Sequence, residues 1–332
     1  MLSVIMPIYN EERYIVSCME SILQQDYPQD DLEVVLVDGM STDRTRELVR
    51  PYTEKYPFVR LIDNPHKIVP YAMNLGIMAT KGEVVMRLDA HARYATNYFS
   101  AITAKLREYD ADNVGCVCRT EVLNKNAKSL AIREVLCNKF GVGNATFRTG
   151  IDRVRDVDTV PFGCWPRRVF EKYGLYNVKL VRNQDIELNK RIVNGGGRII
   201  IIPDTYCTYM ARETFSELAK NNYGNGKWNI LTVYFTHNLK SISLRHLIPL
   251  MFVLGILVPL VVGLFWHPAL LLSLFVVLFY LVTMGFVSLR LAAKKQLNFI
   301  YLLMSFVTLH CSYGWGSLVG ILSVLFKAKS VR

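Results

Sequence analysis

Three long runs without a charged residue occupy the C-terminal part of the chain and limit what it can fold into. They cover residues 247–266, 268–289 and 298–326, which is 20, 22 and 29 residues. A helix needs about 20 apolar residues to cross the hydrocarbon core of a bilayer. One such run could be the buried core helix of a soluble protein. Three in succession, with short polar connections, predict a membrane region.

The charged residues divide the chain at Glu217. Beyond it there are ten basic residues and no acidic one, whereas the first 217 residues hold 29 basic and 28 acidic side chains. The basic residues flank the apolar runs, an arrangement that anionic lipid headgroups favour and that argues against a nucleic-acid partner. The seven cysteines show no CxxC pair or zinc spacing, which predicts reduced thiols in the cytosol. Because the chain opens directly into a strand, we expect no signal peptide.

The first 210 residues alternate between apolar strands and amphipathic helices. The strand candidates are LSVIMP, LEVVLVD, VRLIDN and EVVMRLDA. This alternation predicts stacked βαβ units, that is, an α/β domain with a mostly parallel, Rossmann-like sheet. Ligands bind at the carboxyl ends of the strands in such sheets. The residues at those ends are Tyr9, Asn10, Glu11, Asp38, Asp89 and His91.

The predicted organisation is a nucleotide-binding domain over 1–215, an interfacial linker over 216–246 and an α-helical membrane region over 247–332. The basic connection RLAAKKQLN should be cytoplasmic, which also places the N-terminal domain in the cytoplasm after two crossings. The third run either crosses fully or breaks at its softer middle, HCSYGWGS, and returns, so two to four helices are expected. Gly316 and Gly320 have the GxxxG spacing that allows close helix contact.

Asp89 and His91 are two residues apart at the end of a predicted strand, so their side chains should share one face. A carboxylate and an imidazole together suit Mn²⁺ or Mg²⁺, with histidine favouring Mn²⁺. A divalent ion there could stabilise a diphosphate leaving group. A solvated strand end is the alternative for an isolated Asp-x-His pair.

Four motifs occur in order at suitable separations: VIMPIYNEERYI, VVLVDGMSTDRT, AMNLGIMATKGEVVMRLDAH and NQDIELNKRI. Together they resemble the family 2 glycosyltransferases, inverting enzymes of the GT-A type, over about residues 2–210. With the basic membrane region, the chain is similar to the branch that builds bacterial exopolysaccharide repeat units on a lipid carrier, including the succinoglycan type. DAHARY points most strongly to that branch.

The resemblance implies roles for several of these residues. Pro7, Tyr9 and Glu11 would line the nucleotide pocket, and Asp38 would accept a hydrogen bond from the base, uracil. Asp89 would lie near the sugar and the metal-bound diphosphate. His91 would take the place of the second Asp of the DxD motif, which leaves Mn²⁺ or Mg²⁺ open as the cofactor. Taken singly, each of these residues also fits an ordinary packing, turn or helix-start role.

Inverting transfer needs a general base that takes the proton of the acceptor hydroxyl. Members of the family use the Asp of an ED motif, and here NQDIEL keeps Asp185 with Gln184 before it. The resemblance therefore assigns the base to Asp185. An ordinary first-turn aspartate beside the helix dipole is the alternative.

Two further sites have weaker support. Lys227 and Trp228, in NNYGNGKW, stand where processive synthases carry QxxRW; they could contact a diphosphate or anchor at the membrane interface. Because QxxRW itself is absent, a processive synthase is disfavoured. Arg168, in GCWPRRVF, could bind the donor diphosphate or the acceptor, or form a solvated surface pair with Arg167.

The expected activity is that of a hexosyltransferase. It would move one sugar from a nucleotide-sugar, UDP-linked, to a polyprenyl-diphosphate-linked acceptor at the cytoplasmic leaflet of the inner membrane, in assembly of exopolysaccharide, capsule or O-antigen. One rival is a polyprenyl-phosphate sugar synthase, and another is a non-catalytic membrane sensor of nucleotide-sugars. A transporter is disfavoured because the apolar runs contain no carboxylate.

Overall fold

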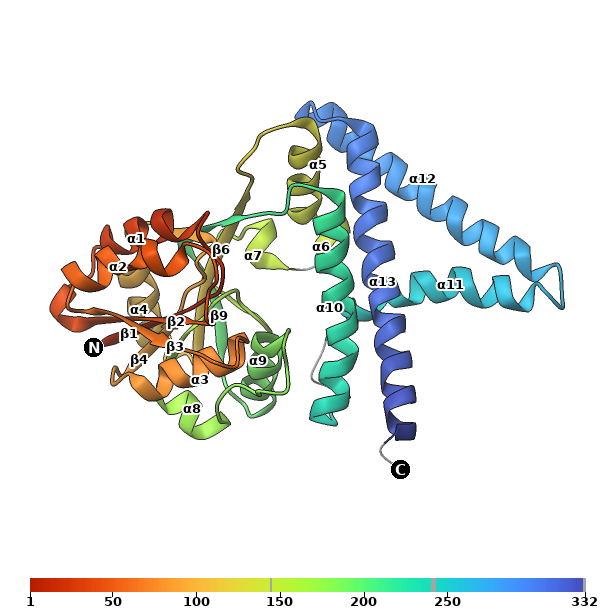
Figure 1. Cartoon of the computed structure of the whole chain (residues 1–332). Coiled ribbons are helices and arrows are strands. Elements are labelled where there is room, and N and C mark those ends of the chain that lie inside the picture. The colour runs from red at the N-terminus through yellow and green to blue at the C-terminus, as the bar shows by residue number, and fades with distance from the viewer. Residues whose placement is uncertain (144, 240–242, 331–332) are drawn as a thin grey trace. The chain divides into compact units, whose positions relative to one another are not determined.

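The computed structural model describes residues 1–143, 145–239 and 243–330. These residues form two compact units (Figure 1). The first, which we call the sheet unit, comprises Met1–Arg119 and Thr146–Met210. The second, the helical unit, comprises Thr120–Ala145 and the chain from Ala211 onward. Residues 120–145, which fell within the expected segment 1–215, thus lie with the C-terminal helices. Arg332, at the end of the expected membrane region, lies outside the described residues.

The first half of the sheet is built as the sequence predicts. Strands β1 (Leu2–Ile8), β2 (Leu32–Asp38), β3 (Val59–Asp63) and β4 (Val84–Arg87) are parallel, in the order β3-β2-β1-β4. Helices α1 (Ile15–Leu23), α2 (Thr45–Lys55) and α3 (Val69–Ala79), with the short helix η1 (Gln29–Asp31), connect them. Their carboxyl ends therefore meet at one edge.

Beyond β4 the sheet becomes antiparallel. It continues through β8 (Cys164–Pro166), β6 (Asn113–Glu121), β9 (Ile199–Met210) and β5 (Ala92–Tyr94), and β7 (Arg155–Asp156) pairs with β9. Around these strands lie α4 (Tyr98–Glu108), α7 (Thr146–Thr149), α8 (Arg168–Tyr173) and α9 (Gln184–Asn194). The α/β class is confirmed. The sheet is mixed, because antiparallel strands, among them the long β6 and β9, complete the parallel half.

The helical unit contains α5 (Ala127–Leu136), α6 (Lys139–Val142), α10 (Phe215–Thr236), η3 (Leu244–Leu247), α11 (Ile248–Val262), α12 (Ala269–Lys295) and α13 (Phe299–Ser330). Most of the expected linker is thus one long helix, α10. Helix α13 runs unbroken through HCSYGWGS, so a hairpin at that point is excluded.

Glycines bring α10 and α13 into backbone contact, as the GxxxG spacing predicts. A Cβ added at Gly316 would come within 2.1 Å of the Tyr223 carbonyl oxygen, and one at Gly320 within 2.8 Å of that of Lys227. On the other helix, a Cβ at Gly226 would meet the Tyr313 carbonyl at 2.0 Å. Close approach of this kind is how helices associate in membranes.

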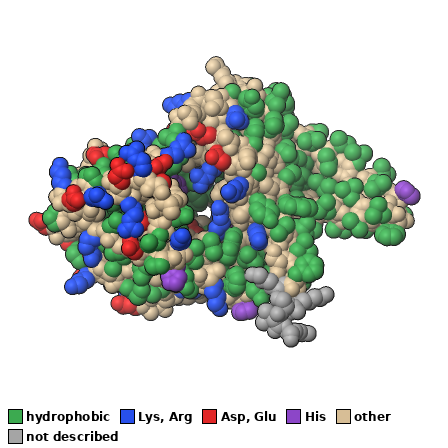
Figure 2. All heavy atoms as spheres, in the orientation of Figure 1, with side chains coloured by type: hydrophobic (Ala, Val, Ile, Leu, Met, Phe, Trp, Pro, Cys, Tyr) green, Lys and Arg blue, Asp and Glu red, His purple; other side chains and the backbone are tan. Residues whose placement is uncertain are grey.

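Three segments of the helical unit are long and apolar enough to cross a membrane: Arg245–Val262, Ala269–Lys295 and Phe299–Phe326. Hydrophobic side chains cover the hairpin of α11 and α12 (Figure 2). Near its tip, Phe265 is 88% exposed. Soluble proteins rarely expose an apolar surface of this extent. The chain is therefore a membrane protein.

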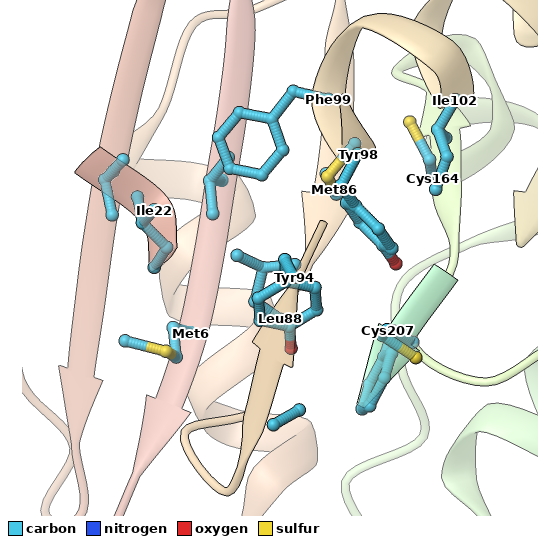
Figure 3. Packing of buried hydrophobic residues seen from close by; sticks show 14 of the residues in the cluster. Met6, Ile22, Met86, Leu88, Tyr94, Tyr98, Phe99, Ile102, Cys164 and Cys207 are labelled. Atoms are coloured by element: carbon cyan, nitrogen blue, oxygen red, sulfur yellow. The ribbon is translucent and has the colours of Figure 1, made fainter. Parts of the chain in front are cut away.

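The core of the sheet unit lies on both faces of the sheet. Along β1, Val4 and Met6 belong to one buried cluster and Ile5 to the other, in the period of two that a strand imposes. Burial on both faces explains why the parallel strands read as continuous apolar runs. Tyr94 and Leu88 fill the first cluster (Figure 3). This packing fixes the segment that carries Asp89.

Candidate active site

The structure brings the predicted nucleotide residues to one edge of the sheet. Asp38 ends β2, Tyr9 and Glu11 follow β1, and Asp89 follows β4. Pro7 lies inside β1 and is partly buried. Because the three strands are parallel neighbours, these residues share the edge at which such sheets bind ligands.

The Asp38 carboxylate is fully buried and already has partners. It accepts hydrogen bonds from the Ser41 backbone N–H at 3.1 and 3.2 Å and from the Ser41 hydroxyl at 2.5 Å. Arg46 forms an ion pair with it at 3.1 Å. Tyr9, in contrast, is 44% exposed and its ring lies against Gly39. At this edge of the sheet, the exposed ring of Tyr9 therefore lies beside the Asp38 carboxylate, which is held by Ser41 and Arg46.

The prediction that Asp89 and His91 alternate along one strand is wrong. β4 ends at Arg87, and the chain then turns, with the Ala92 N–H donating to the Asp89 carbonyl at 3.3 Å. The Tyr94 hydroxyl accepts from the Asp89 N–H at 2.8 Å and donates to the Asp89 carbonyl at 3.1 Å. The backbone N–H and C=O of Asp89 thus bond to the buried Tyr94 hydroxyl and not to a neighbouring strand.

The side chain of Asp89 pairs with Arg87, the last residue of β4. The guanidinium Nε and Nη2 donate to the two carboxylate oxygens at 3.0 and 3.3 Å. The Arg87 side chain is only 8% exposed and that of Asp89 18%. Burial by itself lowers the pKa of Arg87, but the charges of Asp89 and then of Tyr176 and Asp185 outweigh it, so the pKa is raised. The pair is bidentate and charge-assisted, the strongest geometry of its kind.

Asp185 belongs to the same electrostatic cluster. It lies in the first turn of α9 and is partly exposed, and its Oδ1 accepts from the Ile186 N–H at 2.9 Å. Burial raises the pKa of Tyr176; the Arg87 guanidinium opposes this, and the charges of Asp185 and Asp89 add to it. Leu188 of α9 lies in the same buried cluster as Tyr176 and Val85 of β4, so the helix that carries Asp185 packs beside the strand that ends at Arg87.

This cluster has hydrogen-bonding capacity left. Among the described residues, Arg87 Nη1, the Tyr176 hydroxyl and Gln184 Oε1 are buried polar atoms without a hydrogen-bond partner. Buried polar atoms are nearly always paired in folded proteins, with protein, water or a ligand. One of these atoms belongs to Gln184, the neighbour of Asp185 in the first turn of α9.

His91 contacts a different acid. Its Nδ1 lies 3.3 Å from Glu11 Oε1, and its ring packs edge-on to Tyr209, with centroids 5.2 Å apart. Burial raises the pKa of the Cys18 thiol, and the charges of Glu11 and Asp89 raise it further. The Cys18 thiol lies 3.8 Å from the Asp89 carbonyl oxygen and so contacts this turn.

The donor types at this turn fit a divalent cation in part. Asp89 and His91 are partly exposed and of the right chemistry. Within the described ranges, no three His, Cys, Asp or Glu side chains converge as a complete site. Mg²⁺ in proteins is commonly held by one or two carboxylates plus substrate phosphates. A cation here would depend on a bound diphosphate for most of its ligands.

Arg168 is not part of this site. β8 runs antiparallel to β4 with Val84 opposite Pro166, so residues 167 and 168 lie at the amino end of β4, away from Asp89. There Arg168 is half exposed and pairs with Asp110 at 2.8 Å. Lys227 and Trp228 lie on α10 in the helical unit, where Trp228 stacks on Phe235.

Two members of the cluster were missed by sequence reasoning. Arg87 stands within the otherwise apolar stretch VVMRL. A single charged residue inside an apolar strand is unusual, and this signal could have identified it. Tyr176 gives no such signal, because a tyrosine in an irregular segment is unremarkable by position. Only the fold brings it to Arg87.

A comparison with known families decides the class of the protein. The model of the family described as glycosyl transferase family 2 matches residues 3–177. The chain belongs to this family. One relative is the dolichyl N-acetyl-alpha-D-glucosaminyl phosphate 3-beta-D-2,3-diacetamido-2,3-dideoxy-beta-D-glucuronosyltransferase of Methanococcus voltae. It is 24% identical over 275 residues, which are 77% of this chain and 85% of the relative. The succinoglycan biosynthesis protein ExoA of Rhizobium meliloti is 26% identical over 258 residues, 74% of each chain.

Solved structures have the same fold as this family 2 glycosyltransferase. The mannosyltransferase PcManGT from Pyrobaculum calidifontis, in complex with GDP-Man and Mn²⁺, superposes with a TM-score of 0.59 at 19% identity, over 97% of this chain and 87% of that one. TarS 1-349 of S. aureus, in complex with UDP-GlcNAc, gives 0.52 at 17% identity, over 97% and 92%. These likenesses concern the fold.

Proposed function

We propose that this family 2 glycosyltransferase moves one sugar from a UDP-sugar to a hydroxyl of a polyprenyl-diphosphate-linked acceptor, with inversion. The observation that supports the proposal is that α9, which carries Asp185, packs through Leu188 into the same buried cluster as Tyr176 and Val85 of β4, the strand that leads to Asp89. One carboxylate follows a central strand and the other begins a helix. A sugar ring between them would have its leaving group on one side and its attacker on the other.

The nucleotide would bind at the ends of β1 and β2. The exposed ring of Tyr9 offers a face for the base, and Pro7 and Glu11 flank it along the chain. Asp38 would accept from the base in exchange for one of its present partners, because Ser41 and Arg46 already supply two contacts to each carboxylate oxygen.

Asp89 and His91 would hold a divalent cation, Mn²⁺ or Mg²⁺, together with the diphosphate. When bound, such an ion neutralises charge on the departing nucleotide. Arg87 would keep the Asp89 carboxylate in one orientation through its two hydrogen bonds. The relatives with solved metal complexes support a cation in proteins of this fold.

Asp185 would act as the general base toward the acceptor hydroxyl. Its partial exposure leaves it open to an incoming substrate, and the backbone N–H of Ile186 orients one of its oxygens. The name of the Methanococcus relative describes transfer to a lipid-linked sugar. A sugar hydroxyl needs a base, unlike the ionised phosphate that a polyprenyl-phosphate sugar synthase would use.

The helical unit would hold the enzyme in the cytoplasmic membrane as a multi-pass protein. Arg290, Lys294 and Lys295 at the end of α12 favour the cytoplasmic side there. In this arrangement the donor arrives from water and the acceptor from lipid, and Lys227 and Trp228 on α10 are candidates to contact the acceptor diphosphate.

The test is a membrane assay with Asp185→Asn. Membranes are incubated with a panel of nucleotide-sugars and a lipid extract, and lipid-linked products are weighed by mass spectrometry. Loss of a general base should slow transfer by about 10²–10⁴-fold, with UDP binding by calorimetry unchanged. Asp156→Asn, an exposed acid of the same unit, is the control. Near-normal turnover of Asp185→Asn would instead favour the polyprenyl-phosphate sugar synthase.

A further inference from the structure

The two ends of the hairpin of α11 and α12 are basic, and both lie at α13. Arg245 precedes the hairpin, and Lys294 and Lys295 end it. At the first end, a Cβ at Gly314 of α13 would meet the Pro249 carbonyl oxygen of α11 at 2.2 Å. At the second end, α12 passes into the start of α13 through a short connection. Helix α13 therefore links the beginning of the hairpin to its end (Figure 1).

The length of α13 sets the distance between these two ends. Phe299 and Gly314 are about four helical turns apart, or about 22 Å at 1.5 Å per residue. If α13 crossed the bilayer, one end of the hairpin would lie deep within the hydrocarbon core, which is about 30 Å thick. Basic residues beside membrane helices collect on the cytoplasmic side. Both basic ends stay at that interface only if α13 runs along it.

The long helix α10 packs beside α13 and carries charges. The Phe215 and Tyr301 rings have centroids 6.2 Å apart, and a Cβ at Gly320 would lie 2.8 Å from the Lys227 carbonyl oxygen, so the two helices run parallel. A crossing α13 would take α10 with it, and with α10 the charges of Glu217 and Lys227. Charged side chains are costly in hydrocarbon.

Helix α5 covers another part of α13. Ala131 and Val135 of α5 share a buried cluster with Phe306 of α13. Glu134, whose side chain is 5% exposed, pairs with Lys295 at the end of α12 at 2.7 Å. A helix of ten residues with charges of its own cannot span a bilayer, so this part of α13 belongs outside the hydrocarbon core.

The pattern of exposure also separates α13 from α12. Near the tip of the hairpin, Leu270, Leu271 and Leu272 of α12 are consecutive and exposed, so α12 is apolar on several sides there. Between residues 300 and 324 of α13, the exposed positions follow at intervals of four and seven residues, which puts them on one face. This apolar stripe comprises Ile300, Met304, Cys311, Trp315 and Leu322.

The apolar stripe faces the hairpin, since Cys311 and Trp315 line a pocket together with Ile256 of α11. We infer that only α11 and α12 cross the bilayer, and that α13 lies along its cytoplasmic surface with the stripe at the boundary of headgroups and acyl chains. The basic sequence KAKSVR then stays in the cytoplasm, as the positive-inside rule favours. The inference rests on the proposed function only for the cytoplasmic placement of the sheet unit.

Reporters fused to the full chain test the number of crossings. A fluorescent protein that matures only in the cytoplasm, or alkaline phosphatase, which is active only outside it, is fused after Arg332 and produced in bacterial cells. The same fluorescent protein before Met1 reports the side of the sheet unit. Both ends should fluoresce, with phosphatase activity near background. Fluorescence at the N-terminal fusion together with phosphatase activity after Arg332 would overturn the inference.

A cysteine at the tip of the hairpin tests whether α11 and α12 cross fully. His267→Cys, at an exposed position, is combined with Cys311→Ser. A membrane-impermeant maleimide should label this cysteine in intact spheroplasts. Asp110→Cys in the same background, on the 88%-exposed side chain in the sheet unit, should react only after the membrane is opened. Equal protection of both cysteines would overturn the two crossings.

Fluorescence quenching measures the depth of α13. A fluorophore on the native Cys311 is compared in vesicles of lipids brominated near the headgroup or deep in the acyl chains. The shallow quencher should act severalfold more strongly, whereas Leu278→Cys/Cys311→Ser, on a 51%-exposed position of α12, should show the reverse. Stronger deep quenching at Cys311 would overturn the surface position of α13. A wild-type melting temperature in detergent shows that each variant is folded.

The outcomes separate this inference from the proposed function. A cytoplasmic reporter after Arg332, without lipid-linked product in the transfer assay, keeps the topology and overturns the proposed function. Product formation by a chain whose C-terminal reporter lies outside the cytoplasm overturns the topology and keeps the function.

Discussion

The two units of this protein differ in what holds the residues that matter most in each. In the sheet unit, buried or partly buried charges are held by partners of opposite sign, as with Arg87 and Asp89 or Arg46 and Asp38. In the helical unit, backbone contacts at glycines such as Gly316 fix the helices. The first arrangement is sensitive to loss of charge and the second to added volume. Each prediction below tests one side of this contrast.

The largest effect should come from Arg87→Met. This change leaves Asp89 with a charge that has lost its bidentate partner, and breaking a buried pair costs about 3–5 kcal/mol. Chemical denaturation measures the free energy of unfolding. The double variant Arg87→Met/Asp89→Asn should regain part of the loss, because no carboxylate charge remains unpaired. Equal free energies of unfolding for Arg87→Met and the wild type would show that the ion pair does not stabilise the sheet unit.

Next in size is the effect of Asp89→Ala on transfer. Loss of a group that stabilises developing charge lowers rates by about 10²–10³-fold, so release of UDP in acceptor-containing membranes should nearly stop. Asp110→Ala, which removes the partner of Arg168 at the other end of β4, should keep wild-type rates. Unchanged UDP release by Asp89→Ala would contradict the role of this carboxylate.

Added volume should matter in the helical unit. Gly316→Leu places a side chain where the Tyr223 backbone lies and should destabilise the α10–α13 pair by about 1–3 kcal/mol, the range for overpacking. Gly285→Leu on α12 is the matched control, because nothing lies within 4 Å of its added Cβ. Thermal unfolding in detergent compares the two. Equal melting temperatures would show that the glycine contact does not hold the helices.

The smallest effect concerns acid. Burial raises the pKa of Glu33, but hydrogen bonds from Ser3, Lys81 and Gly82 and the charge of Arg60 lower it more, so its pKa is below the ordinary value. A depressed pKa contributes stability above the unfolded value, about 4.3, that is lost as the pH falls through the folded value. Glu33→Gln should therefore lose less stability than the wild type between pH 5 and acid. If the wild type and Glu33→Gln lost the same free energy of unfolding as the pH fell from 5 into the acid range, this prediction would be contradicted.

The sequence predicted the parallel strands and the apolar runs because both depend on local periodicity. It also placed Tyr9, Asp38 and Asp89 correctly at the strand ends, since parallel strands align their carboxyl ends. It misjudged the turn after Arg87, because the Asp89 N–H donates to the hydroxyl of Tyr94, five residues further on, and hydrophobic periodicity does not reveal such a side-chain contact. It could not pair strands β8 and β4, so Arg168 was given a site that the antiparallel register denies it.

The most direct measurement is an experimental structure of the protein with a non-reacting UDP-sugar analogue and Mn²⁺. The account predicts one sugar ring lying between Asp89, near the metal-bound diphosphate, and Asp185, near the anomeric carbon. Arg87 should still bridge to Asp89. A complex in which the two carboxylates face separate cavities, with the sugar in contact with only one of them, would contradict it.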